Sequence, residues 1–394
     1  MNKTIIATLW RPDDGGQPIM AHLLLCGLLE DGVKVILFHG STVTDQGNNI
    51  LESLSKQGAK CVDCKLLSNN KILGAVLDLI RLTKEVNPDA VVSFQQRDRI
   101  IALLASKFSQ KKVILHIGGM PDHRGSSIRQ LLAHNLLKYA YGKAEHIVVV
   151  NNKIKQYLIQ EIQIPSDSIE VILNGIDQYE LNHWMTISAE TAQPFEKRKN
   201  NLDLLAVGRL VPVKGHDLLI KSLESINDIF LTLRIAGAPG PNKSDRDYLE
   251  ILKNLALKSR HNILFMGDLP RNEIFSHLLY SDLYIQPSRS EGWSLALSEA
   301  MSSGKYVIFT DCAGVPNDLL ETVNRNNSTP SVGNTQELAA SIKQFISQSE
   351  SENTRYTNKL KAFSEQHLNI NTTVKKFNES VQSVITKNQC ELNE

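Results

Sequence analysis

The sequence has almost no excess charge and no long apolar run. Its 394 residues contain 43 Lys and Arg against 42 Asp and Glu, a formal net charge of +1. That balance gives no overall attraction to nucleic acid, and no zinc-finger or RNA-binding aromatic signature is present. No stretch approaches the ~18 uninterrupted apolar residues of a membrane-spanning helix. The start, MNKTIIATLW, is too short for a signal peptide and is typical of a buried first strand.

Cysteine pairs and metal-ligand clusters are also scarce. The five cysteines are an odd number, so reduced thiols in a cytoplasm are expected rather than disulfides. Cys61 and Cys64 form a lone CxxC, which without a second pair predicts part of an edge strand rather than a zinc site. We therefore expect a cytoplasmic protein with no metal and no cofactor.

Strand and helix patterns alternate along the whole chain. Short β-branched runs separated by helical patterns predict parallel βαβ units and an α/β fold. The predicted strands are Thr4–Leu9, Val33–Phe38, Ala59–Cys64, Ala90–Phe94, Val113–His116, His146–Val150, Ile169–Ile172, Asp203–Val207, Thr232–Ala236, Ile263–Met266, Leu283–Gln286 and Tyr306–Phe309. The predicted helices include Met20–Glu30, Lys71–Val86, Thr335–Ser349 and Thr372–Lys387.

The length favours two domains, since a single core rarely grows to this size. The segment from Asp177 to Asn201 is polar and irregular, and its Glu196–Asn200 run is charged, so it is predicted to be a linker. We expect an N-terminal domain over residues 1–177, a linker over 178–200 and a C-terminal domain over 201–370. A final helix is expected over 371–394.

Two cations follow a predicted strand in the block VGRLVPVKG, residues 207–215. Arg209 can make a forked contact to phosphate oxygens and Lys214 a point contact. Such a pair can do the work of a divalent cation, and we find no Asp-x-Asp motif that would recruit one.

Two carboxylates lie in the block QPSRSEGWSLALSEAMSSGKYVIFTD, residues 286–311. Ser294 is expected to cap a helix that begins at Leu295, whose first amides suit an anion. Glu299 lies roughly 6 Å further along the same helix face, where a ribose would be in reach. Glu291 precedes the helix and can point toward a transferred group. Each charge alone could be a solvated surface charge, but together they predict a site for a sugar diphosphate nucleotide.

Three further residues extend this predicted site. Gly16 lies in a Gly-Gly turn before the first helix, where backbone can approach phosphates, although glycine often only makes a turn. Leu269, in the Gly267–Pro270 turn, is predicted to contact the base. His116 ends a strand ahead of two glycines, a position at which a lone histidine is more often structural than catalytic.

These blocks, in this order, resemble the retaining glycosyltransferases of family 4, which have the GT-B fold. The resemblance rests on VGRLVPVKG, the Glu-x7-Glu block, Asn174–Asp177, the Asp14–Gly16 turn and LHIGG around His116. Departures are Tyr306 for a usual proline, Ser294 for a common glycine and Asn317 for a frequent glutamate.

The resemblance implies two Rossmann-like parallel-sheet domains facing each other across a cleft, with the C-terminal helix crossing back to the first domain. It implies transfer of a sugar, with retention of configuration, from a nucleotide diphosphate sugar, for which we favour UDP. The acceptor would be a hydroxyl of a glycan or lipid-linked glycan, as in bacterial cell-surface polysaccharide synthesis. His116 would contact the donor sugar and the acceptor.

Other functions stay open at this point. The same fold serves sugar-nucleotide epimerases and phosphorylases, and a non-catalytic nucleotide-sugar-binding protein would carry similar motifs. A serine hydrolase is disfavoured, because Pro287–Gly292 separates Ser294 from the preceding strand, whereas a nucleophile elbow follows its strand directly.

The segment Arg124–Lys143 contains basic residues beside leucines and no acidic residue. It is predicted either to contact an anionic membrane or to be a helix with a solvated basic face.

Overall fold

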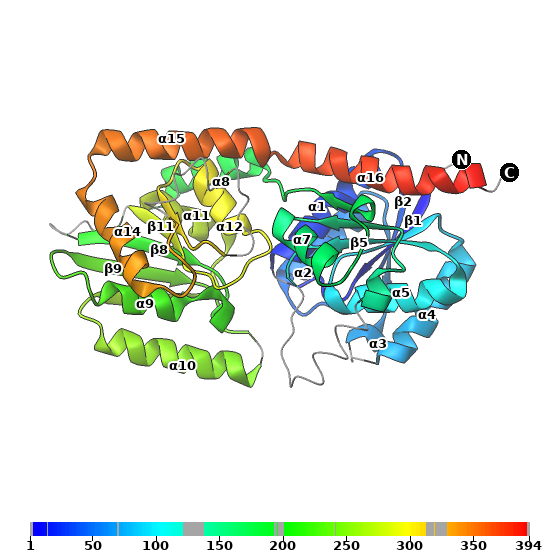
Figure 1. Ribbon diagram of the computed structural model, residues 1–394, viewed down its shortest axis with the longest axis horizontal. Coiled ribbons are helices and arrows are strands. Elements are labelled where there is room, and N and C mark those ends of the chain that lie inside the picture. Colours follow the sequence, from blue (N-terminus) through cyan, green and yellow to red (C-terminus); the bar gives the residue numbers. More distant parts are fainter. Residues whose placement is uncertain are drawn as a thin grey trace. The chain divides into compact units, whose positions relative to one another are not determined.

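The computed structural model describes residues 3–13, 15–68, 71–120, 138–192, 195, 201–240, 242–312, 319 and 329–391. The chain forms two compact units, one of Met1–Asn174 with Asn371–Glu394 and one of Gly175–Ile370 (Figure 1). The predicted segment Arg124–Lys143 lies mostly outside the described residues, as does Asp14. None of the described helices is long and apolar enough to cross a bilayer.

The first unit is built on a seven-stranded parallel sheet of order β3-β2-β1-β4-β5-β6-β7. Its strands are rich in Val, Ile and Leu and mostly buried, as expected where helices cover both faces. They are β1 (Thr4–Leu9), β2 (Lys34–His39), β3 (Lys60–Asp63), β4 (Ala90–Ser93), β5 (Lys112–Ile117), β6 (His146–Val149) and β7 (Ile169–Val171). Cys61 lies in β3, an edge strand, as predicted.

The helices of the first unit include the last one of the chain. They are α1 (Gly16–Glu30), α2 (Asp45–Lys56), α3 (Lys65–Ser68), α4 (Ile72–Val86), α5 (Gln96–Ser109), α7 (Asn152–Gln160), the 3-10 turn η1 (Ser166–Ser168) and α16 (Ile370–Glu391). A Cβ on Gly27 of α1 would lie 2.0 Å from Val374 of α16, so the helices are in close contact. Phe377 of α16 is fully buried.

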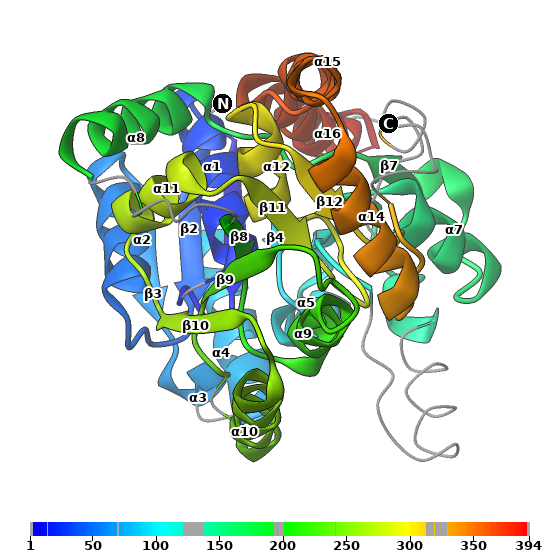
Figure 2. The ribbon, with the colours of Figure 1, turned by 90° about the vertical axis from the view of Figure 1, so that its left-hand side faces the viewer.

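The second unit is built on a five-stranded parallel sheet of order β10-β9-β8-β11-β12 (Figure 2). Its strands are β8 (Asn201–Val207), β9 (Phe230–Ala236), β10 (Asn262–Gly267), β11 (Leu283–Gln286) and β12 (Val307–Phe309). Its helices are α8 (Gln178–Thr191), η2 (Pro212–Lys214), α9 (His216–Leu223), α10 (Lys243–Lys258), α11 (Arg271–Tyr280), α12 (Leu295–Ser302), α14 (Thr335–Ser347) and α15 (Glu350–His367). A core of aliphatic and aromatic side chains joins the sheet to α9, α10 and α14.

The prediction of an irregular linker over residues 178–200 is wrong for its first part. Residues Gln178–Thr191 form the helix α8, and the Asp177 carboxylate caps it by accepting from the amides of Tyr179 and Glu180. The helix packs on α11 and therefore belongs to the second unit. Its sequence looked like a linker because only a narrow face is buried.

The strand order of the second sheet reverses direction between β8 and β11. Because all its strands are parallel, their carboxyl ends lie at one edge, and ligands of such sheets bind where the order reverses. The segments after β8 and β11 carry the two blocks that predicted the site.

Candidate functional site

The segment after β8 is shaped by two glycines with positive φ. Gly208 has φ +155°, and Gly215, at the end of η2, has φ +69°. A Cβ on Gly215 would lie 1.9 Å from the carbonyl oxygen of Pro287, so only glycine allows this segment to touch the one after β11. Arg209 is exposed between the two glycines.

The structure brings Lys214 and Glu291 together. The Nζ atom of Lys214 lies 2.6 Å from Oε1 of Glu291, and the Ser288 hydroxyl donates to the same oxygen over 2.7 Å. The two side chains are 22% and 10% exposed, so the pair is largely shielded from water. A cation and a carboxylate predicted from separate blocks therefore form one partly buried polar site.

An ion pair that the sequence did not reveal holds these two segments together. The Arg289 guanidinium forms two 2.8 Å contacts with the two carboxylate oxygens of Asp217, and it also donates to the Pro212 carbonyl over 2.6 Å. Its amide donates to the Val213 carbonyl over 2.7 Å. The Tyr248 hydroxyl donates to Asp217 over 2.6 Å.

Burial alone would raise the pKa of Asp217. Hydrogen bonds from Arg289 and Tyr248 outweigh that effect and lower the pKa, so the carboxylate stays charged. We call Arg289 and Asp217 the loop clamp, because together they fasten the segment that carries Lys214 to the one that carries Glu291.

The start of α12 confirms the predicted cap. The Ser294 hydroxyl accepts from the amide of Leu297 and donates to the Gln286 side chain over 2.6 Å. The side chains of Leu295 and Ala296 are only partly buried, and amides in a first helical turn have no intrahelical partner. This end of α12 therefore offers donors to an anion, while Ser294 is committed to capping rather than to a nucleophilic role.

Glu299 has a cationic partner that was not predicted. Its Oε1 accepts from Nη2 of Arg271 over 2.9 Å, and Nε of the same guanidinium lies 3.0 Å from Glu180 of α8. Burial raises the pKa of Glu299, and Arg271 opposes that rise. Glu299 is therefore not a solvated surface charge. Leu269, half-buried, lies two positions before Arg271.

One Asp-x-Asp triplet lies outside the two blocks, at Asp245–Asp247 in the first turn of α10. Asp245 is buried and accepts from the Asn242 side chain, while Asp247 is exposed and pairs with Lys243. Because the two carboxylates point to different sides of a helix, they do not form a chelate. Among the residues that the structure describes, no three His, Cys, Asp or Glu side chains form a group that could hold a metal.

Gly16 and His116 lie in the first unit. Gly16 is the exposed first residue of α1 and follows Gly15, whose φ is +128°. Gly118, after β5, approaches Gln17, since a Cβ there would lie 2.9 Å from that side chain. The Gly-Gly turn and the segment after β5 are therefore neighbours.

The His116 ring lies in an aromatic cluster. Its centroid is 5.6 Å from that of Phe94 and 6.1 Å from that of Phe377, and the residue is 4% exposed. Burial lowers the pKa of His116 to about 3, and the nearby Arg99 adds to this effect. The imidazole is thus neutral at ordinary pH, and these surroundings favour a packing role. Its predicted contact with the donor sugar and acceptor stays a prediction.

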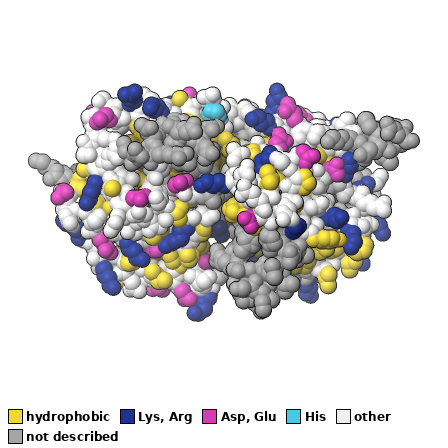
Figure 3. Space-filling view, in the orientation of Figure 1, with side chains coloured by type: hydrophobic (Ala, Val, Ile, Leu, Met, Phe, Trp, Pro, Cys, Tyr) yellow, Lys and Arg dark blue, Asp and Glu magenta, His cyan; other side chains and the backbone are white. Residues whose placement is uncertain are grey.

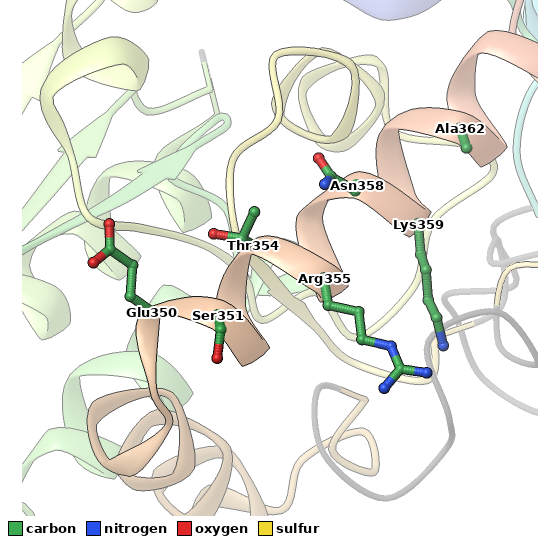
Figure 4. A pocket seen from close by; sticks show the side chains of 7 residues that line it. All are labelled: Glu350, Ser351, Thr354, Arg355, Asn358, Lys359 and Ala362. Carbon is green, nitrogen blue, oxygen red and sulfur yellow. The ribbon is translucent and has the colours of Figure 1, made fainter.

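An open hollow in the second unit lies along α15, between Glu350 and Ala362 (Figure 4). Its described lining residues all come from that helix, and none of them belongs to the candidate site.

Two parallel α/β units, one of which gathers a cation, two carboxylates and a helix start at its carboxyl edge, have an architecture of GT-B type. Residues 14–179 match the family model "Glycosyltransferase Family 4", and residues 188–362 match "Glycosyl transferases group 1". The chain belongs to these glycosyltransferases.

Sequence relatives of the chain are also glycosyltransferases, at low sequence identity. The chain is 27% identical over 201 residues to the putative glycosyltransferase YtcC of Bacillus subtilis, covering 47% of this chain and 49% of that protein. It is 23% identical over 197 residues to the phosphatidylinositol N-acetylglucosaminyltransferase GPI3 subunit of Saccharomyces cerevisiae, covering 48% and 41%. The chain thus aligns with less than half of the length of these two relatives.

Solved structures match over nearly the whole chain. HepE of Anabaena, in complex with UDP-glucose, superposes with a TM-score of 0.76 at 19% identity, covering 96% of this chain and 99% of that one. A glycosyltransferase from Rickettsia africae superposes with a TM-score of 0.73 at 19% identity, covering 98% and 99%. The GT-B fold predicted from the motifs is confirmed.

Proposed function

We propose that the protein transfers a sugar from a UDP-sugar to a hydroxyl of a glycan or lipid-linked glycan, with retention of configuration. The observation that carries this proposal is the Lys214–Glu291 pair, which lies where the order of the second sheet reverses. UDP is favoured because the HepE structure contains UDP-glucose. A lipid-linked acceptor is supported by the yeast relative, which is named as a subunit of a phosphatidylinositol N-acetylglucosaminyltransferase.

Each residue of the candidate site has a separate role in this proposal. Arg209 and Lys214, with the first amides of α12, stabilise the diphosphate on which negative charge develops. Glu291 faces the transferred sugar, and Glu299 accepts hydrogen bonds from the ribose. Leu269 and Gly16 line the nucleotide. No metal ion or cofactor takes part, since the nucleotide sugar is a substrate and cations of the chain face the phosphates.

The bond between the anomeric carbon and the phosphate oxygen breaks, and a bond from the acceptor oxygen to that carbon forms on the same face. The departing phosphate takes the proton of the acceptor hydroxyl. The setting would be bacterial cell-surface polysaccharide synthesis, with a cytoplasmic enzyme at the inner face of the membrane.

An NMR time course of the new anomeric signal tests the proposal, with candidate UDP-sugars first screened by thermal stabilisation. A product with the donor's configuration is expected. An inverted product would overturn the same-face mechanism. Binding of UDP-sugar with no transfer to any acceptor would favour a non-catalytic binding protein.

A further inference from the structure

Five large apolar side chains are exposed on two neighbouring helices of the first unit; one of them, Ile72 of α4, is 41% exposed, and the other four occur as two pairs with a spacing of four residues. Leu73 and Leu77 of α4 are 78% and 55% exposed, and Leu104 and Phe108 of α5 are 38% and 66% exposed. We call these four residues the α4–α5 patch. In each helix the two residues are four positions apart and therefore lie on one face.

The two helices that carry these residues are neighbours. α4 and α5 pack against each other, and the Lys111 ammonium after α5 donates to the Asn87 side chain after α4 over 2.6 Å. Figure 3 shows hydrophobic side chains gathered over this region, with Lys and Arg side chains around them. Elsewhere the exposed apolar residues are more scattered. Ile251 and Leu257 of α10, for example, are six positions apart and point to different sides.

The charge around the patch is basic. Lys84 lies only about 20° around the helix axis from Leu73, and Lys107 precedes Phe108. The nearest carboxylate on α4, Asp78, is paired with Arg81 at 3.1 Å. Glu85 lies about 120° around the axis from Leu73 and so faces away from the patch.

This combination of apolar and basic groups favours an anionic bilayer over a second copy of the chain. In a two-fold dimer built on the patch, lysines of one copy would meet the same lysines of the other, which is unfavourable. An anionic bilayer can bind both the apolar and the basic side chains, because the apolar side chains insert below the head groups while the lysines reach the lipid phosphates.

We propose that the α4–α5 patch seats the first unit on an anionic lipid bilayer. This inference deepens the proposed function by assigning the surface that meets the membrane of a lipid-linked acceptor, and it rests on that proposal. The surface differs from Arg124–Lys143, which the sequence alone singled out.

Flotation of the full-length protein with vesicles tests the assignment. One set of vesicles is phosphatidylcholine alone, and the other is phosphatidylcholine mixed with phosphatidylglycerol. The protein is expected to float with the anionic vesicles and to lose binding as salt rises. Leu73→Ser/Leu77→Ser/Phe108→Ser should weaken that binding at least about tenfold. Lys84→Glu/Lys107→Glu should weaken it as well and flatten its salt dependence.

The matched control is Ile251→Ser/Leu257→Ser, which changes equally exposed residues of α10 in the second unit and should bind like the wild type. Unchanged flotation of the triple serine variant would overturn the assignment and point to another surface, such as Arg124–Lys143. A wild type that does not float with anionic vesicles overturns it too. So does a shift from dimer to monomer in sedimentation velocity of the variant, which would assign the patch to a second copy.

Calorimetric UDP binding is measured on the same samples. It reports on the transferase proposal separately, because vesicle binding needs no donor and the patch variants are expected to bind UDP like the wild type.

Discussion

Glu291 and Glu299 lie eight positions apart, but they have different partners. Glu291 is held by Lys214 and Ser288, whereas Glu299 is held by Arg271. We expect Glu299→Ala to weaken UDP binding by roughly 1.5–3 kcal/mol, since charged hydrogen bonds to ribose are lost. Glu291→Ala should mainly lower kcat. Calorimetry with UDP, alongside steady-state kinetics, measures both.

Glu273→Ala, an exposed change on α11, is the control and should leave both quantities unchanged. An equal loss of UDP affinity in the two site variants would mean that the ribose and sugar contacts are wrongly divided between these glutamates.

The His116 imidazole gives the molecule a specific acid sensitivity. An unfolded histidine titrates near ~6.5, whereas burial lowers the pKa of His116 to about 3 in the folded state. As the pH falls below about 6.5, only the unfolded chain takes up this proton, so stability is lost on acidification. The difference in unfolding free energy between wild type and His116→Leu should therefore fall by on the order of 3 kcal/mol between pH 7 and pH 4.

Urea unfolding of both proteins at the two pH values measures this change. Other buried histidines, such as His216, titrate alike in both proteins and cancel. An identical pH dependence of the two proteins would show that water reaches the imidazole. Transfer assays on the same variant decide its role, since loss of kcat with UDP binding intact would support the predicted sugar contact.

Motifs in the sequence identified charged residues of the candidate site, but not the partners that hold those charges. Lys214, Glu291 and Ser294 were predicted, and the structure brings the first two together and makes the third a cap. Arg271, Arg289 and Asp217 were missed. Each of their ion pairs joins elements far apart in sequence, and no local spacing encodes such a contact.

At the scale of elements, the loop clamp links the segments after β8 and β11. Arg289→Ala and Arg289→Lys are both expected to weaken UDP binding by about 1.5–3 kcal/mol, because a lysine cannot reproduce the fork to Asp217. Asp217→Asn should have a similar effect, and the double variant should be no worse than either single one. Calorimetry with UDP and kinetics measure the set.

Arg260→Ala is the control, because the Arg260 guanidinium makes an exposed hydrogen bond to Asn227 and the residue precedes β10, at the opposite edge of the sheet. A lower melting temperature with UDP affinity unchanged would reduce the clamp to a purely structural contact. Full rescue by Arg289→Lys would contradict the need for a fork.

Strands were easier to predict than polar helices. The buried runs at Thr4–Leu9 and Leu283–Gln286 match β1 and β11, since a strand covered on both faces is apolar throughout. The helices α8 and α15 were missed because most of their residues face water. Their caps were visible, since Asp177 and Ser349 hold the first amides, but a cap without an apolar stripe is a weak signal.

For the whole molecule we expect sugar transfer without a divalent cation. In the proposed mechanism Lys214, Arg209 and the start of α12 supply positive charge to the diphosphate, so turnover should persist in excess EDTA. The measurement is release of UDP with and without chelator. Complete loss in EDTA that is restored by Mg²⁺ or Mn²⁺ would refute a metal-free reaction.

The two segments that connect the units are themselves paired within the second unit. The Ile176 amide donates to the Leu368 carbonyl over 2.7 Å, and the Ile370 amide donates to the Ile176 carbonyl over 3.1 Å. The ends of the second unit are therefore neighbours, as in a domain inserted into a host. On a ribosome, residues 175–370 emerge complete before α16 does. The second unit can thus fold during synthesis. The first unit cannot be completed until α16 has emerged, and until then the surface that later covers Phe377 stays exposed and accessible to chaperones.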